Sequence, residues 1–325
     1  MSISNNFSYI DKDFDTADEF IDFFRTHRWL KTKLEHLAFY DGMNGFIFRG
    51  QSNKDWKLVP SAFRGNKLIT YTPQTAGDVQ PDRKNRPMWL GWHLHSELRA
   101  VNLFLEAADR LGIPNPIDYT SNKEHQDLLV SALNNQETEL YNSPFPCNRI
   151  LNELALAQHH GVPTRLIDWT ESPFIAAFFA AYEASIFKSD QQRIKSERIA
   201  VLMLRTNEMH KHSDDLTIVK APRHANWFLR TQKGLFTHMP KANKYYLDNG
   251  NWPSIEDIVD HIPELERCLT RVSLPTSKAD DLLRVLYDMD ITRHSLMPSL
   301  DNAAQACEYT LKLYRNYSND SSIRI

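Results

Sequence analysis

The chain has 325 residues, a formal net charge of -3 and a hydrophobic fraction of 42%, which indicates a globular protein with enough volume for a proper core. The negative charge argues against a protein that coats nucleic acid through a broad basic surface. The first twenty residues do not resemble a signal peptide, no apolar run is long enough to span a membrane, and three widely spaced cysteines indicate a reducing compartment. We therefore expect a cytoplasmic protein without membrane contact.

The first half of the chain predicts a helix, a strand and a long helical region. Thr16 to Phe24 has a helical pattern, and Gly45 to Arg49 is a strand that ends where Gly50 permits a sharp turn. Residues 90–142 are mainly helical. The basic stretch Asp82 to Arg86 is interpreted as a solvated loop, with contact to a phosphate backbone as the alternative.

A helix, a turn and a short strand are predicted between residues 150 and 168. Apolar residues recur at helical spacing from Ile150 to Ala157, and Gly161 and Pro163 provide the stop signal. Thr164 to Asp168 leaves room only for a brief extended segment.

A second helix follows at once. Ser172 is the expected N-cap, Pro173 occupies the first helical position, and Phe174 to Ala184 is almost wholly apolar. Such a helix must be buried on most sides. Its N-terminus, the positive end of the helix dipole, is expected to point at residues 168–170 and to favour an anionic or carboxamide group there.

The second half of the chain mixes strands and helices. Arg198 to Arg205 is a continuous apolar run, as expected of a buried strand. Three further strands are predicted at Leu216 to Lys220, Gly234 to His238 and Cys268 to Ser273. Two helices are predicted near the end, one running to Met289 from a start like a capping box at Ser277 and Asp280, and one from Asp301 to Tyr314.

Scattered strands and segregated helices favour an α+β fold with a mixed or antiparallel central sheet and helical additions. No linker divides the chain. We predict a single domain over residues 1–325, with a mainly helical insertion at about 66–148 and a helical C-terminal part at about 254–316.

Polar side chains are unusually dense between the two central helices, and core packing alone rarely requires so many donors and charges. The cluster consists of Gln158, His159, His160, Thr164, Arg165, Asp168, Trp169, Thr170 and Ser172. Asp168 is either a site residue or a helix cap that pairs with Arg165. Arg49 is placed to grip a phosphate or carboxylate at the sheet rim, or it pairs with Asp41 or Asp168.

The tandem histidines are not expected to bind a metal ion, because adjacent positions on a helix face different directions. No other residues form a metal site around them. We expect one histidine to bond Asp168 or Thr164 and the other to pack near Trp169. The indole of Trp169 either stacks on a ligand ring or belongs to the core.

Four stretches together resemble the FRG domain family, which occurs in bacteria and phages. Residues 48–51 (FRGQ) carry the motif that names the family, and residues 158–180 (QHHGVPTRLIDWTESPFIAAFFA) resemble its signature. Residues 230–237 (RTQKGLFT) and 291–300 (ITRHSLMPSL) are also similar to this family. The resemblance implies a shared fold and a setting in bacterial or phage conflict, such as phage defence or a toxin.

A weaker resemblance connects the chain with the ADP-ribosyltransferase superfamily, in which a strand ending in Arg-Gly precedes a polar strand and an apolar helix. It implies a split sheet, an NAD substrate and no metal. The implied catalytic residues are Arg49, Asp168, Thr170, Gln232 and His159. The implied cofactor-binding residues are Arg49, Gly50, Gln51, Thr164, Arg165, Trp169, Thr170 and Ser172.

The weak point of that resemblance is Gln232, which stands where a transferase carries a carboxylate. Cleavage of the nicotinamide–ribose bond passes through a positively charged state that a carboxylate stabilises, and a glutamine is neutral. Asp168 and Glu153 are the local substitutes.

The resemblance thus implies an NAD-using enzyme that modifies a macromolecular target, protein or nucleic acid. The alternative is a non-catalytic nucleotide- or nucleic-acid-binding sensor or interaction module with the same pocket. No P-loop, dinucleotide-binding glycine fingerprint, GxSxG elbow or HExxH helix is present in the sequence, which argues against the commoner hydrolases and dehydrogenases.

Overall fold

The structure is a computed structural model, and the description below covers eleven parts of the chain. These are residues 9–25, 45–65, 67–72, 85–112, 150–185, 194–207, 209–220, 227–300, 302–304, 306–308 and 310–311. Several sequence predictions lie outside them: Asp41 as a partner of Arg49, most of the basic stretch at 82–86, the predicted helix beyond 112 and the end of the last helix. One of the three cysteines, Cys147, also lies outside them.

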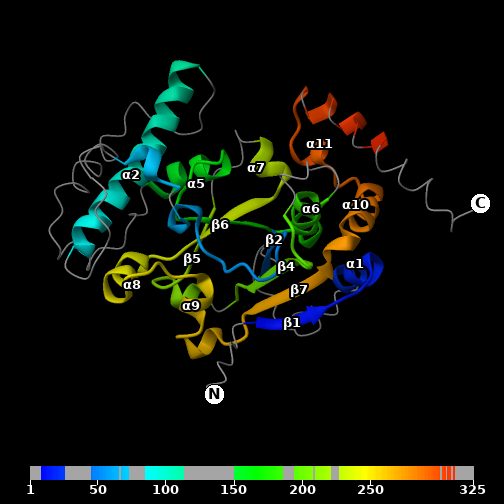
Figure 1. Cartoon of the computed structure of the whole chain (residues 1–325), viewed down its shortest axis with the longest axis horizontal. Coiled ribbons are helices and arrows are strands. Elements are labelled where there is room, and N and C mark those ends of the chain that lie inside the picture. The colour runs from blue at the N-terminus through cyan, green and yellow to red at the C-terminus, as the bar shows by residue number, and fades with distance from the viewer. Residues whose placement is uncertain are drawn as a thin grey trace, which may run out of the picture.

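A seven-stranded mixed sheet forms the centre of the molecule, in the order β1-β7-β4-β2-β3-β6-β5 (Figure 1). Only β1 and β7 pair in parallel, and the other neighbours are antiparallel. The strands are β1 (Tyr9–Asp13), β2 (Phe46–Gln51), β3 (Ile167–Thr170), β4 (Arg198–Arg205), β5 (Thr217–Val219), β6 (Gly234–His238) and β7 (Leu269–Pro275). The predicted α+β class is confirmed.

The sheet opens between β2 and β3. Strand β2 pairs with β4 along its whole length, and β3 pairs with β6 over all four of its residues. Between β2 and β3, however, the register contains only Phe48 opposite Thr170. The sheet therefore consists of two well-paired halves that meet at one residue pair.

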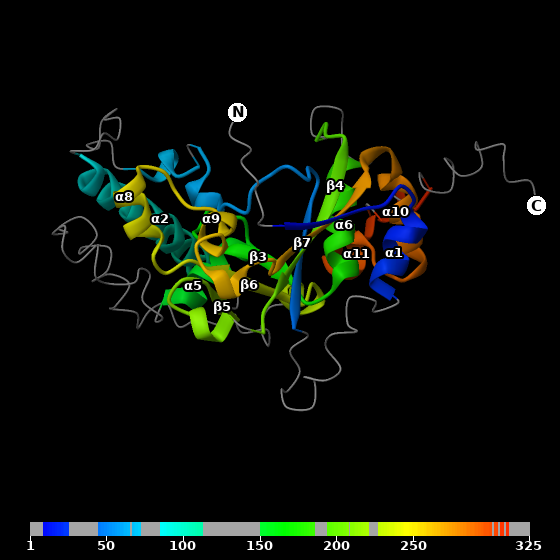
Figure 2. The ribbon, with the colours of Figure 1, turned by 90° about the horizontal axis from the view of Figure 1, so that it is seen from below.

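Helices lie in two groups with the sheet between them (Figures 1 and 2). One group is α1 (Ala17–Arg25), α6 (Pro173–Ala184) and α10 (Ala279–Asp288), and the other is α2 (Arg86–Arg110), α5 (Leu151–His159), α8 (Ala242–Asn249) and α9 (Ile255–Val259). Neighbouring residues of β4 pack on opposite faces of the sheet. Val201 packs against the first group of helices, and Leu202 packs in the core that includes α9. The short helices α7 (Trp227–Thr231) and α11 (Arg293–Leu296) lie in the last third of the chain.

Several local predictions are confirmed. Strands β4 and β6 have the predicted bounds, and α1, α5 and α6 begin and end within a residue or two of the expected positions. The Ser172 side chain caps α6 by accepting from the backbone N–H of Ile175 at 3.5 Å, and Pro173 is the first helical residue.

The sharp turn predicted at Gly50 is wrong, because β2 continues to Gln51. A Cβ at Gly50 would lie 2.0 Å from the carbonyl oxygen of Ala176 and 2.7 Å from the backbone nitrogen of Ala180. The glycine is needed for close packing of β2 against α6, not for a turn.

Two element starts are also corrected. The short strand begins at Ile167 and not at Thr164, because the Thr164 hydroxyl accepts from the backbone N–H of Leu166 at 3.3 Å, a local bond that competes with strand pairing. The capping box at Ser277 is absent, since a 3-10 turn precedes α10 and its N-cap, Lys278, makes no side-chain cap bond.

The sequence patterns missed β1 and the short helices α7 and α8, and they did not delimit α9 and α11 within the C-terminal part predicted as helical. Strand β1 lies at the sheet edge, and four of its five residues are exposed, so that it has no apolar alternation to detect. The C-terminal part predicted as helical includes β7, which lies between β1 and β4. Described residues between 300 and 311 are helical.

Candidate functional site

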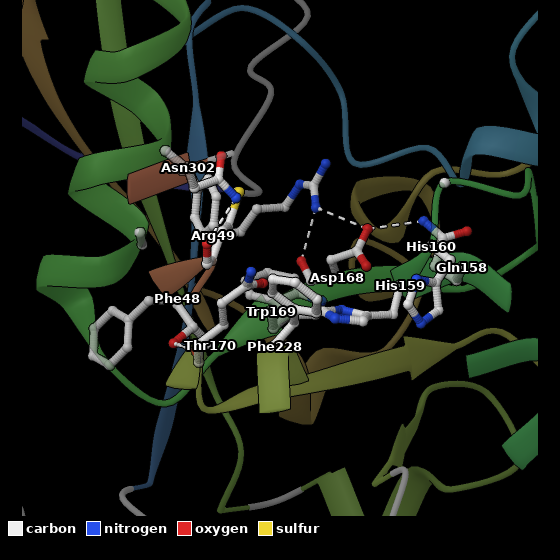
Figure 3. Close-up of a pocket in the computed structure, with 16 residues that line it drawn as sticks. Phe48, Arg49, Gln158, His159, His160, Asp168, Trp169, Thr170, Phe228 and Asn302 are labelled. Carbon is white, nitrogen blue, oxygen red and sulfur yellow. Dashed lines mark hydrogen bonds and ion pairs between the residues drawn. The ribbon is translucent and has the colours of Figure 1, made fainter. Parts of the chain in front are cut away.

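A pocket of about 570 Å³ lies where the sheet opens, within the range of small-molecule sites. Strands β2 and β3 and helices α5, α6 and α7 contribute to its walls, together with the segment after α11 (Figure 3). Its lining residues are Phe48, Arg49, Gly50, Gln158, His159, His160, Gly161, Asp168, Trp169, Thr170, Ala176, Phe179, Phe228, Gln232, Met297 and Asn302.

Arg49 bridges the opening between the strands. Its Nη1 donates to the backbone carbonyl of Asp168 at 2.8 Å and lies 3.8 Å from Oδ2 of the same residue. The side chain is 20% exposed, and its Nε is buried without a hydrogen-bond partner. Burial lowers the pKa of the guanidinium and the charge of Asp168 opposes that effect. Arg49 thus supplies a side-chain contact where backbone pairing stops.

Gln158 connects α5 to the pocket carboxylate. Its Nε2 donates to Asp168 Oδ2 at 2.8 Å. Its Oε1 accepts from Ser61 Oγ at 3.1 Å and from the Thr164 backbone N–H and hydroxyl at 3.2 and 2.9 Å. Because three donors converge on the oxygen, the amide nitrogen must face Asp168.

Asp168 presents a carboxylate to the pocket. Its side chain is 46% exposed, and that exposure faces the pocket that the residue lines. Burial of the surrounding site raises the pKa of this carboxyl, while Arg49 and the hydrogen bond from Gln158 lower it. Figure 3 shows Asp168 between the guanidinium of Arg49 and the amide of Gln158. Of the two partners predicted for Arg49, Asp41 and Asp168, the structure shows Asp168.

Thr170 and Gln232 form another wall. The Thr170 hydroxyl donates to the backbone carbonyl of Gln232 at 2.8 Å and accepts from the Ser172 N–H at 3.1 Å. The Gln232 amide in turn donates to the carbonyl of Leu296 at 3.3 Å. These bonds join β3, the end of α7 and the C-terminal segment, so three distant parts of the sequence meet here.

The histidines differ from the expectation. Gln158, not a histidine, donates to the Asp168 carboxylate and accepts from the Thr164 hydroxyl, and His160 stacks on Phe104 of α2. His159 lines the pocket 6.3 Å from the ring of Phe228, measured between centroids. Burial, with a smaller effect of His160, lowers the pKa of His159 to about 4, so its ring is neutral at pH 7.

Trp169 belongs mainly to the core. It is 4% exposed, and its indole Nε1 donates to the Thr237 hydroxyl at 2.9 Å. Trp169 also borders the pocket. Of the two predicted roles for the indole, the structure favours packing over stacking on a ligand.

Four residues predicted to bind a cofactor do not line the pocket. Gln51 and Thr164 are buried, and Ser172 caps α6. Arg165 is 1% exposed and forms a buried ion pair with Glu97 of α2, with Nη2 at 2.7 Å from Oε2.

Arg165 is instead a structural brace. Its backbone N–H also donates to Glu97 Oε1 at 2.7 Å, and its Nη1 donates to Asn243 of α8 at 3.1 Å. The alternative pairing of Asp168 with Arg165 is therefore wrong, since the partner of Arg165 is Glu97. A buried pair with this many bonds holds α2 and α8 against the start of β3.

Sequence reasoning missed several lining residues. Phe48, Ala176 and Phe179 lie in the family-like stretches 48–51 and 158–180, but their apolar pattern does not separate the pocket wall from the core. Phe228 and Asn302 stood outside every recognised motif. Met297 lies in residues 291–300, so the family-like stretch was the signal that could have found it.

Comparison with protein families gives one match, which covers residues 44–189 and is the FRG domain. The chain contains an FRG domain. Searches among curated proteins and solved structures found no match. The FRG domain supplies β2, α5, β3 and α6, which carry Arg49, Gln158, His159 and Asp168. Phe228, Gln232, Met297 and Asn302 lie beyond the match, so the C-terminal third completes the FRG pocket.

Two properties bear on the kind of site. Among the residues that the structure describes, no three histidine, cysteine, aspartate or glutamate side chains gather as a metal-binding group. None of the described helices is long and apolar enough to cross a bilayer.

Proposed function

We propose that this protein is an NAD-using enzyme similar to ADP-ribosyltransferases, which cleaves the nicotinamide–ribose bond and transfers ADP-ribose to a macromolecule. The observation that carries the proposal is the carboxylate of Asp168, held by Gln158 beside Arg49 and exposed to a pocket of about 570 Å³. The opening of the sheet between β2 and β3 supports the resemblance to a split-sheet transferase.

Asp168 provides the charge that Gln232 lacks. When the bond between C1′ of the ribose and the nicotinamide nitrogen breaks, its electron pair leaves with nicotinamide and the ribose becomes an oxocarbenium-like cation. An ionised carboxylate beside the ring stabilises that cation. The other local candidate, Glu153, is 4% exposed and does not line the pocket. A nucleophile of the target, or water, then attacks C1′ and loses its proton.

Other pocket residues have roles in binding. Arg49 is the lining residue with a guanidinium, and a guanidinium suits a phosphate or a ribose hydroxyl. The rings of Phe228 and His159 offer an apolar and a neutral polar surface for a heterocycle. This separation of a charged and an aromatic side matches a ligand that is itself part anionic and part heterocyclic.

We place the enzyme in the cytoplasm, in a bacterial or phage conflict system. The compartment is supported by the free state of Cys268 and Cys307. The conflict setting is supported by the FRG domain alone. The target, protein or nucleic acid, is identified by the transferred label in the experiment below.

The test is incubation of purified protein with labelled NAD and cell lysate, with mass spectrometry for nicotinamide and detection of labelled macromolecules. The wild-type protein is expected to release nicotinamide, and Asp168→Asn is expected to retain NAD binding but lose release. Arg49→Gln should lose both, whereas Arg110→Gln, which changes a 79% exposed arginine on α2, should behave as wild type.

Two results would decide against the proposal. Saturable NAD binding that depends on Arg49, without nicotinamide release, would indicate the non-catalytic sensor instead. Neither binding nor release at millimolar NAD would reject NAD as the ligand of this pocket. Thermal melting with and without NAD reports the binding in both cases.

A further inference from the structure

The amide of Asn302 lines the pocket and has unused hydrogen-bonding capacity. Asn302 follows α11 and lies beyond the FRG match. Its Oδ1 accepts from Arg293 Nε at 2.9 Å, and its Nδ2 donates to the Met297 carbonyl at 2.7 Å. An asparagine side chain has two acceptor lone pairs and two N–H donors. Within the part of the chain that the structure describes, one lone pair and one N–H of this amide therefore have no protein partner.

Two partners of opposite kind fix which way the amide faces. A guanidinium only donates and a carbonyl only accepts, so Oδ1 must lie toward Arg293 and Nδ2 toward Met297. Arg293 is itself held, because its Nη1 donates to the Tyr182 hydroxyl of α6 at 2.5 Å and its guanidinium lies 5.5 Å from the centre of that ring. Asn302 thus has a defined orientation before a ligand arrives.

The segment after α11 is anchored to α7 as well. The Leu296 carbonyl accepts from the Thr231 hydroxyl at 2.9 Å and from the Gln232 amide at 3.3 Å. The next residue, Met297, lines the pocket and carries the carbonyl that holds the Asn302 amide. Asn302 is therefore presented by a wall that both α6 and α7 hold in place.

The pocket offers surfaces for a ring on two sides. Figure 3 shows Asn302 toward one side of the pocket and His159 toward the other. Beside Asn302, the thioether of Met297 favours contact with an aromatic ring. Beside His159, the Phe228 ring lies 6.3 Å away between centroids. A dinucleotide carries one heterocycle at each end, and this arrangement suits such a ligand.

We propose that Asn302 is a specificity-determining residue that recognises a heterocycle with a hydrogen-bond donor beside an acceptor. The carboxamide of nicotinamide and the amino edge of adenine share this chemistry. The unused N–H of Asn302 donates to the acceptor, and the unused lone pair accepts from the donor. A site built in this way rejects an analogue that lacks the donor, because its own polar atoms are then left unpaired. The choice of NAD as the ligand rests on the proposed function.

The test measures dissociation constants by calorimetry for NAD and two analogues that each change one heterocycle. Nicotinic acid adenine dinucleotide has a carboxylate in place of the carboxamide, and nicotinamide hypoxanthine dinucleotide has a carbonyl in place of the adenine amino group. The wild-type protein is expected to bind one analogue about tenfold more weakly than NAD, the effect of one lost hydrogen bond. The analogue that binds more weakly identifies the heterocycle that Asn302 contacts.

Asn302→Ala is expected to remove this preference. It should bind NAD about tenfold more weakly than the wild type does, and it should bind the disfavoured analogue with the wild-type affinity. Asn249→Ala removes the same amide from an exposed residue of α8 and should keep the wild-type preference. Thermal melting without ligand verifies that both variants are folded.

Three results would overturn the inference: equal affinity of the wild type for all three dinucleotides, an unchanged preference in Asn302→Ala, or equal weakening of all three ligands in that variant, which indicates a structural effect. In each case nicotinamide release still decides the proposed activity. If the preference depends on Asn302 but no nicotinamide is released, the recognition site stands and the enzyme proposal fails. Absence of binding of all three dinucleotides to the wild type would reject both.

Discussion

Gln158 donates its side-chain amide to the Asp168 carboxylate at 2.8 Å, while its own oxygen accepts from Ser61 and Thr164. The two residues are ten positions apart and belong to a helix and a strand. The bond favours the ionised carboxylate, against the burial that raises the pKa of Asp168. Gln158 is therefore a positioning residue whose loss should alter the pH dependence of the proposed reaction.

We predict that Gln158→Met shifts the acid limb of nicotinamide release to higher pH. Without the donor the pKa of Asp168 rises, so a larger share of the carboxyl is protonated at a given acidic pH. A hydrogen bond to a charged group is worth about 1.5 kcal/mol, so kcat/KM should fall about tenfold on that limb and less at pH 8. The measurement is kcat/KM from pH 5 to 8.

Ser61→Ala provides the control for that variant. It removes one of three donors to Gln158 Oε1 and leaves the amide that faces Asp168 in place. Its pH profile should stay close to that of the wild type. A Gln158→Met profile with the wild-type midpoint would show that the amide does not govern the charge of Asp168.

Gly50→Ala is predicted to destabilise the fold by about 3 kcal/mol, the upper part of the usual range for overpacking. The new methyl carbon would overlap backbone atoms of Ala176 and Ala180, which cannot rotate away. Urea denaturation measures the free energy of unfolding. The matched variant is Gly65→Ala, where no atom lies within 4 Å and only the positive φ of 51° opposes a side chain; it should cost about 1 kcal/mol. Equal losses in the two variants would contradict the close packing of β2 on α6.

Glu97→Leu is predicted to lower the free energy of unfolding by about 3 to 5 kcal/mol, because it leaves the Arg165 guanidinium buried without its carboxylate. The double variant Glu97→Leu, Arg165→Met should recover most of that loss, since neither charge then remains. Chemical denaturation of the two variants checks both values. If Glu97→Leu lowered the free energy of unfolding by less than about 1 kcal/mol, the ion pair of Arg165 would not be important for holding α2 and α8 against β3.

Because the pKa of His159 is lowered in the folded protein, we predict that the free energy of unfolding depends on pH. Its pKa falls from the usual 6.5 in the unfolded chain to about 4 in the folded one, so the unfolded state binds the proton more readily. The stability that this ring provides is complete above pH 6.5 and is lost as the pH falls toward 4. Replacement by asparagine should reduce the loss between pH 7 and pH 4.5 by roughly 1 kcal/mol, after allowance for partial exposure of the ring.

Urea denaturation at both pH values tests that prediction. His210→Asn, at an exposed histidine, is the control and should lose as much stability as the wild type. An identical loss in wild type and His159→Asn would mean that the ring is solvated in the folded protein.

Apolar patterns and caps predicted the elements around the site because those signals are local. Ser172 with Pro173 marked the start of α6, and the run from Arg198 to Arg205 marked β4. The density of polar residues near Asp168 located the pocket, but it could not assign each residue a role. Arg165 looked as suitable for a ligand as Arg49, and only the position of Glu97 in three dimensions separates the two.

Other features of the site were beyond the reach of local patterns. Phe228 and Asn302 reach the pocket through tertiary packing and have no neighbouring motif. The role of Gly50 is also a long-range one. The residue must be glycine because α6, more than 120 positions later, packs against its backbone, and not because the chain turns there. Such contacts depend on how the sheet and helices assemble.

The single residue pair between β2 and β3 has a mechanical consequence. A sheet resists bending through its ladders of backbone hydrogen bonds, and here the ladder is interrupted beside the pocket. Fewer residue pairs join the two halves here than join any other neighbouring strands of the sheet. The pocket lies beside this gap, so a ligand that contacts both Arg49 of β2 and Asp168 of β3 would connect the two halves of the sheet where backbone pairing is missing.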